Sequence, residues 1–266
     1  MLIESQYGVN ATIRPCRLCG EQRGLSISHA LPNSAFVSAL REGSGKVVAI
    51  VDDQTTPIQF SSDTWGVELL CATCEDKLNR KLDAYGIAVL KGQIGTVLRS
   101  DYGVTFRGID RQRFRAFFLS ILWRISVSSH ASYSNIDLPT HWENELHLAL
   151  KFDQKISGSK YTVAIYRLRD STPDGFTSES LRSIVTAPFA RDYEGKFVSV
   201  CFICFGFLVE IFLSKLPSKI KNKVGVLVGS NSIFMAPFQE IFDIPELVNM
   251  MGSGLYKRDI GLSQID

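Results

Sequence analysis

Two Cys-x-x-Cys pairs, Cys16/Cys19 and Cys71/Cys74, lie in the first third of this chain. Such a pair turns the backbone so that two thiolates converge on one ion, and two pairs complete a tetrahedral four-sulfur site. Zinc prefers soft thiolate ligands, and a site closed by four of them stabilises a fold without taking part in a reaction. The spacing therefore predicts a structural Zn²⁺ bound by these four cysteines.

The composition is that of an ordinary globular protein. Hydrophobic residues make up 45% of the 266 residues and charged residues 21%, which is enough apolar material for a real core. The formal net charge is only +2, so any basic surface must be local. Bulk charge thus argues neither for nor against a nucleic-acid partner.

The cysteines favour a reduced compartment. Residues 1–10 lack the basic start and apolar core of a signal peptide, so we expect a cytoplasmic protein with metal-binding thiols. The most apolar run, Phe197–Leu213, is at the short limit for a membrane span and contains Glu210. Its β-branched and aromatic content predicts buried strand, with Cys201 and Cys204 as core thiols, and no membrane partner.

The pattern along the chain predicts an α+β protein in two parts. Residues 1–90 are expected to form a zinc-binding module, with strands at Leu25–Ser28 and Trp65–Leu70 and a helix at Ala72–Tyr85. Residues 91–266 are expected to form a larger α+β domain with a mainly antiparallel sheet.

The second part contains the clearest helix signal. Asp110 is a plausible N-cap, and apolar residues recur at helical spacing over Arg111–Val127. A second helix is predicted at Thr140–Phe152. Strand-like segments follow at Tyr161–Leu168, Phe197–Leu213 and Lys223–Val228. The polar face of the first helix is predicted to carry four arginines that are candidates for nucleic-acid backbone contacts: Arg111, Arg113, Arg115 and Arg124.

The amino-terminal motifs resemble a known family. Cys16-Arg-Leu-Cys19, then Ser28-His29-Ala-Leu-Pro32, then Cys71-Ala-Thr-Cys74-Glu75, are similar to the zinc-bearing branch of the HNH (ββα-metal, treble-clef-like) nucleases. That branch typically shows Cys-x-x-Cys, Asp-His-x-x-Pro and Cys-x-x-Cys followed by Asn or His. The resemblance covers about the first 85 residues, and its Ser-His-x-x-Pro variant is similar to bacterial defence-associated nucleases.

The resemblance implies a metal-dependent endonuclease. His29 takes the position of the general base that activates water, and Glu75 takes the position of a ligand to a catalytic Mg²⁺ or Mn²⁺. Ser28 takes the remaining ligand position of the family motif. We therefore expect an enzyme that hydrolyses phosphodiester bonds of DNA or RNA, with Ser28, His29 and Glu75 as site residues.

Ser28 is also the departure from the family pattern, because a neutral hydroxyl is a far weaker ligand than the usual carboxylate. One alternative is that Glu75, a water and the substrate phosphate hold the ion, and a second is that Asp76, Asp63 or Asp83 reaches into the site. Another is that catalysis has been lost and the module binds nucleic acid or a protein partner. The structural alternatives for His29 are a fifth candidate zinc ligand or a packed histidine.

The helix of the second knuckle also carries Lys77, Arg80 and Lys81, which could contact phosphates or form a solvated face. The larger domain is expected to bind substrate, a protein partner or a second copy of the chain.

Overall fold

A seven-stranded sheet dominates the computed structural model, which describes residues 14–42, 45, 47–50, 57–158, 160–229 and 232–264. Residues 1–10, where no signal peptide is predicted, lie outside these ranges. The strands are β7 (Thr96–Ser100), β8 (Gly103–Arg107), β9 (Thr162–Arg169), β10 (Phe189–Asp192), β11 (Val198–Cys204), β12 (Phe207–Phe212) and β13 (Ile233–Glu240). Their order is β10-β11-β12-β9-β13-β8-β7, and every pair is antiparallel except β13 with β9. The predicted α+β class with a mainly antiparallel sheet is confirmed.

The apolar run predicted as one strand-like segment is a hairpin. Strands β11 and β12 pair from Ser199↔Phe212 to Cys204↔Phe207, so only Phe205 and Gly206 form the turn. Both turn residues have positive φ, 53° and 73°, which is the geometry of a two-residue type I′ turn. None of the helices in the described ranges is long and apolar enough to cross a membrane.

The prediction of a strand at Lys223–Val228 is wrong. Val226 forms only an isolated bridge with Ala164 in β9, beside a hydrogen bond from the Ile165 N–H to the Gly225 carbonyl. Gly225 has a φ of 94°, which extended backbone does not adopt, and it interrupts the pairing.

Both faces of the sheet are covered. Helices α4 (Arg111–Val127) and α5 (Thr140–Lys151) belong to the main core on one face. On the other face, a second cluster joins β9, β11 and β12 to α6 (Ser178–Ser183), η3 (Ile241–Asp243) and α8 (Pro245–Asp259). Strands β11 and β12 are thus buried on both sides, which explains their continuous apolar sequence. Cys201 and Cys204 are fully buried, as predicted for core thiols.

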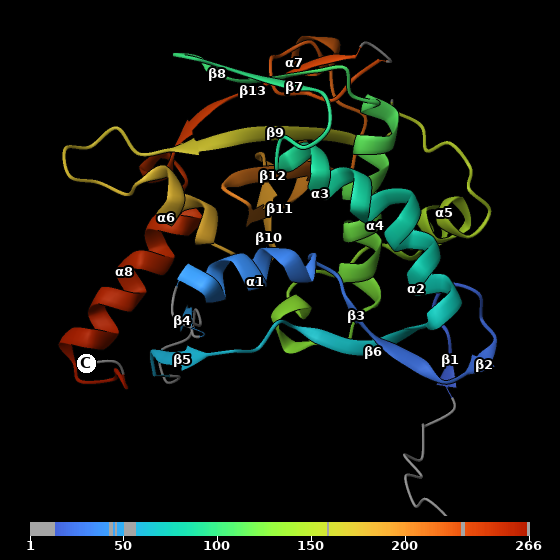
Figure 1. The fold of residues 1–266 in the computed structure, drawn as a ribbon, viewed down its shortest axis with the longest axis horizontal. Coiled ribbons are helices and arrows are strands. Elements are labelled where there is room, and N and C mark those ends of the chain that lie inside the picture. Colours follow the sequence, from blue (N-terminus) through green and yellow to red (C-terminus); the bar gives the residue numbers. More distant parts are fainter. Residues whose placement is uncertain are drawn as a thin grey trace, which may run out of the picture.

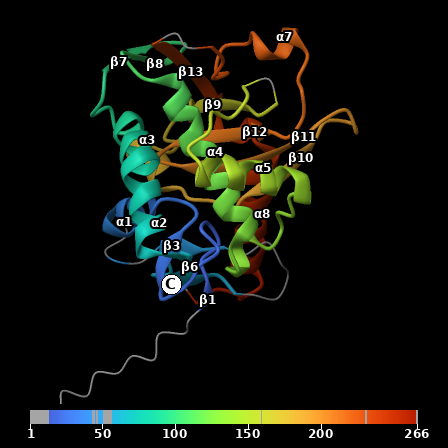
Figure 2. The same ribbon diagram turned by 90° about the vertical axis from the view of Figure 1, so that its right-hand side faces the viewer.

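The amino-terminal part has its strands toward the opposite end of the molecule from β7, β8 and α7 (Ser218–Lys221), as Figures 1 and 2 show. Its strands are β1 (Arg14–Pro15), β2 (Gln22–Arg23), β3 (Leu25–His29), β4 (Val47–Ala49), β5 (Gln59–Ser61) and β6 (Gly66–Cys71), with helix α1 (Asn33–Glu42) after β3. Strand β3 pairs antiparallel with β6, and a long helix follows β6 directly.

That helix runs further than the predicted Ala72–Tyr85. It consists of α2 (Ala72–Leu78), the π-helical turn η1 (Asn79–Asp83) and α3 (Ala84–Leu90). A π-turn inserts an extra residue and rotates the side chains that follow it. Here the turn ends at Asp83, whose side chain is buried.

The two expected parts share one core. The main cluster contains Cys16 and Leu70 from the first part and Phe117 and Ile121 of α4 from the second. Helix α4 has the bounds that its periodicity predicts, and the carboxylate of Asp110 accepts hydrogen bonds from two backbone N–H groups in its first turn. The expected division at residue 90 therefore crosses a continuous packed interior.

Candidate metal centre and the buried network beside it

The four cysteines of the two pairs form one cluster. The Sγ atoms of Cys16, Cys19, Cys71 and Cys74 all lie within 4.8 Å of one another, and those of Cys19 and Cys71 are 3.9 Å apart. A tetrahedral zinc with bonds of about 2.3 Å places its sulfurs about 3.8 Å apart. Three of the residues are buried and Cys19 is half-buried. The donor set and its spacing fit a closed, structural Zn²⁺ site.

The backbone around the knuckles explains why the sulfurs converge. The Gly20 N–H bonds to the Cys16 carbonyl (2.8 Å), and Gly20 takes a φ of 83° that a residue with a side chain rarely adopts. Cys71 ends β6 and Cys74 lies in the first turn of α2. The Cys71 N–H donates to the Cys16 sulfur (3.3 Å), so a hydrogen bond also links the two knuckles directly.

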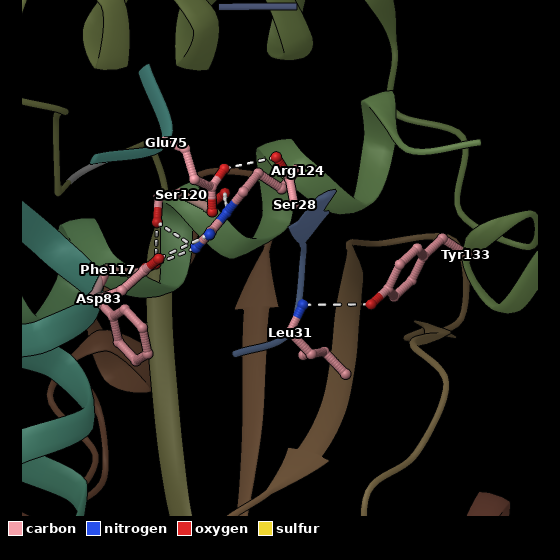
Figure 3. Close-up of polar contacts among 8 residues, drawn as sticks. All are labelled: Ser28, Leu31, Glu75, Asp83, Phe117, Ser120, Arg124 and Tyr133. Atoms are coloured by element: carbon pink, nitrogen blue, oxygen red, sulfur yellow. Dashed lines mark hydrogen bonds and ion pairs between the residues drawn. The ribbon is translucent and has the colours of Figure 1, made fainter. Parts of the chain in front are cut away.

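Ser28 and Glu75 meet beside this cluster. The Ser28 hydroxyl donates to Glu75 Oε2 (2.6 Å), as Figure 3 shows. It also accepts from the Leu70 N–H (3.3 Å). Ser28 is only 1% exposed. The structure thus brings together two of the three predicted site residues, and it places the hydroxyl in the interior of the module.

A guanidinium from the other part of the chain lies next to this pair. Arg124 of α4 forms a two-pronged ion pair with Asp83, at 2.8 and 2.7 Å, and both side chains are buried (Figure 3). Burial lowers the pKa of Arg124, but attraction to Asp83 and to Glu75 outweighs it and raises that pKa. Asp83 is thus the direct partner of this buried cation, and Glu75 adds a further attraction. The prediction that Arg124 lies on the polar face of its helix is wrong.

The other carboxylates considered for the site are engaged elsewhere. Asp76 pairs with Arg80 on the surface, and Asp63 accepts from His130 (3.1 Å). Within the described ranges, the four cysteines are the one group of three or more histidine, cysteine or acidic side chains spaced to hold a metal ion. In the part of the chain that the structure describes, Glu75 therefore belongs to no such group.

His29 lies on the opposite face of β3 from Ser28. Consecutive residues of a strand point to opposite faces, and a Cβ atom built on Gly66 would lie 2.7 Å from Ile27 and 2.8 Å from His29. Ile27 and His29 therefore share the face away from Glu75. The His29 Nε2 is 2.9 Å from the hydroxyl of Thr64. The structure does not bring the imidazole and the Glu75 carboxylate together.

The environment of His29 predicts a pH effect. Burial, and repulsion from Arg124, lower the pKa of His29 below its ordinary value of 6.5, although Asp63 opposes this. Near and below pH 6.5 the unfolded chain therefore binds more protons at this histidine than the folded chain does. His29 does not affect the free energy of unfolding well above pH 6.5, and it lowers that free energy as the pH falls through 6.5. Histidine NMR titration should give a pKa below 6.5 for His29. The His29→Gln variant should lose less stability between about pH 7 and pH 5 than wild type. An equal loss in both proteins would contradict the expectation.

No family model, curated protein or solved structure matches the chain. The Arg124–Asp83 pair was not predicted, although the sequence carries a signal for it. Arg124 lies seven residues after Phe117, which places it on the core face of the helix.

Proposed function

We propose that this chain is a zinc-stabilised nucleic-acid-binding protein whose HNH-like (ββα-metal) module serves as a scaffold and does not hydrolyse phosphodiesters. The observation that carries the proposal is the buried guanidinium of Arg124 beside Glu75 and Asp83. In the nucleases that the motif resembles, a divalent ion would provide positive charge near the residues at the positions of Ser28 and Glu75. Here a side chain of the protein provides it, from a place where substrate does not reach.

The positions of the other two motif residues support the same conclusion. Hydrolysis requires the water-activating base and the charge-stabilising cation to act on one phosphate. His29 and Glu75 lie on opposite faces of β3, and the Ser28 hydroxyl is buried and already bonded to Glu75. A phosphate placed at His29 would therefore lie across the strand from Glu75.

A second candidate is the endonuclease activity that the resemblance implies. The observation that favours it is the half-buried, hydrogen-bonded imidazole of His29, whose lowered pKa keeps it neutral and able to accept a proton near pH 7. The ligands that this hypothesis assigns to a catalytic ion are Glu75 and Ser28, which the structure holds bonded to each other.

A cleavage assay separates the two candidates. We expect wild-type protein with Mg²⁺, Mn²⁺ or Ni²⁺ to cleave plasmid DNA and single-stranded RNA no faster than the His29→Ala variant, and both proteins to bind nucleic acid equally well. Loss of a catalytic base costs about 10²- to 10⁴-fold in rate. A wild-type activity that falls by such a factor in His29→Ala, but persists in the exposed-histidine control His141→Ala, would establish the nuclease.

A further inference from the structure

A groove of about 430 Å³ lies between the helix of the second knuckle and helices α4 and α5. Five cationic side chains line it and only two acidic ones. The cations are Arg80, Lys81, Arg113, Arg115 and Lys155, and the acids are Asp110 and Asp153. The groove thus unites the two groups of basic residues that the sequence singled out separately, one on the knuckle helix and one on α4.

Backbone carbonyls, which carry no full negative charge, fix two of these arginines in place. Arg113 donates to the carbonyls of Lys81 (2.6 Å) and Arg80 (3.1 Å), and its guanidinium lies 4.4 Å from the centre of the Tyr85 ring. Arg115 donates to the Ile156 carbonyl (2.7 Å). Its buried Nε has no hydrogen-bond partner among the described residues, and burial lowers its pKa. The guanidinium groups of Arg113 and Arg115 are thus held in place by carbonyl oxygens and keep their positive charge.

Of the five cations, Arg80 pairs with Asp76 on the same helix and Lys81 pairs with Asp153, and both ion pairs are exposed. Asp110 accepts from backbone N–H groups as the N-cap of α4. Asp153 is shared by Lys81 (2.6 Å) and Lys77 (3.3 Å) at an exposed position. Exposed ion pairs of this kind contribute about 0–1 kcal/mol, so an incoming phosphate can replace the carboxylate at little cost. No acid pairs with Lys155 in the part of the chain described.

Apolar side chains make up most of the remaining lining: Leu78, Leu82, Ala116, Ala149, Leu150 and Ile156. An anionic ligand with a flat apolar group would use both kinds of lining, with its phosphates on the cations and the group against the apolar side chains. Single-stranded nucleic acid has this chemistry because its bases are free to leave the stack, whereas a duplex offers mainly its phosphates.

We propose that this groove, between α2, η1, α4 and α5, binds single-stranded nucleic acid through its phosphates and one or more unstacked bases. The inference rests on the proposed function and assigns it a surface. It places the ligand on the helix that follows the second zinc knuckle, so the zinc site positions one wall of the groove.

Fluorescence anisotropy tests the proposal with labelled twelve-residue oligothymidylate and oligouridylate and with a blunt DNA duplex. The test variant is Arg80→Glu/Lys155→Glu, which reverses two exposed groove charges, and the matched control is Lys219→Glu on α7. Zinc content and circular dichroism should be unchanged in all variants. We expect Kd for the single strands to rise about tenfold or more in the double variant, and the slope of log K against log salt to fall by about 1.4 for two lost phosphate contacts.

Three other results would each contradict one part of the proposal. If the wild type binds single strands but the double variant binds them as tightly, the groove is overturned and the proposed function stands. If the wild type binds duplex as tightly as single strands, the ligand class is wrong. If the wild type binds no nucleic acid at about 50 mM salt, where phosphate contacts are strong, the proposed function itself fails.

Discussion

Replacing Cys71 by alanine should abolish zinc binding and unfold the amino-terminal part of the protein. Wild-type protein should contain one zinc per chain by elemental analysis, because the four sulfurs converge on a single point. Structural zinc sites in small domains contribute about 10–16 kcal/mol of apparent binding free energy, comparable with the whole stability of a typical domain, about 5–15 kcal/mol. Hydrogen exchange measured by mass spectrometry should therefore show residues 14–42 and 57–90 losing protection, while β9, β11 and β12 remain protected.

Cys204 provides the matched control. It is also a buried thiol, at 0% exposure, but it packs in the core of the sheet. The Cys204→Ala variant should keep its zinc and lose only the modest stability of a small cavity, on the order of 1 kcal/mol. Full zinc occupancy in Cys71→Ala, or equal zinc loss in both variants, would show that the sulfur cluster is not the metal site.

Local sequence patterns predicted the features that depend on residues close together in the chain. Helix α4 has a strict apolar periodicity and an N-cap aspartate, and both of its ends match the prediction. The cysteine spacing likewise predicted the cluster of four sulfurs, because zinc geometry leaves few ways to arrange two knuckles. The run Phe197–Leu213 was harder, since strands buried on both faces lack alternation. Its Gly206 marks the turn, but glycine alone does not distinguish a hairpin from a bulge.

The candidate site was less predictable, because its decisive contact is long-range. The motif implies that Ser28 and Glu75 lie close together, and a hydrogen bond joins their side chains. The ion pair between Asp83 and Arg124 requires a π-turn and the docking of α4 on the module. Neither is encoded in a short motif. The orientation of His29 follows from the alternation of side chains along β3, which the resemblance to the family motif does not include.

Arg124→Met should be among the most destabilising single substitutions in this chain. The variant preserves most of the side-chain volume but leaves the Asp83 carboxylate buried at 7% exposure without its cation. Breaking a buried pair by removing one partner typically costs about 3–5 kcal/mol. Urea denaturation should show this as a lower midpoint. The urea midpoint of Arg124→Lys should lie between those of wild type and Arg124→Met, because lysine keeps the charge and loses the two-pronged geometry.

Two further variants show whether the unpaired charge of Asp83 causes the loss of stability in Arg124→Met. Arg80→Met removes an exposed pair with Asp76 from the same long helix and should change the free energy of unfolding by less than about 1 kcal/mol. Arg124→Met/Asp83→Leu should recover part of the loss, because it removes the unpaired carboxylate together with its partner. If the double variant is no more stable than Arg124→Met, packing rather than charge determines the effect. The buried guanidinium would then no longer support the proposal that a side chain provides the positive charge of a catalytic ion in this module.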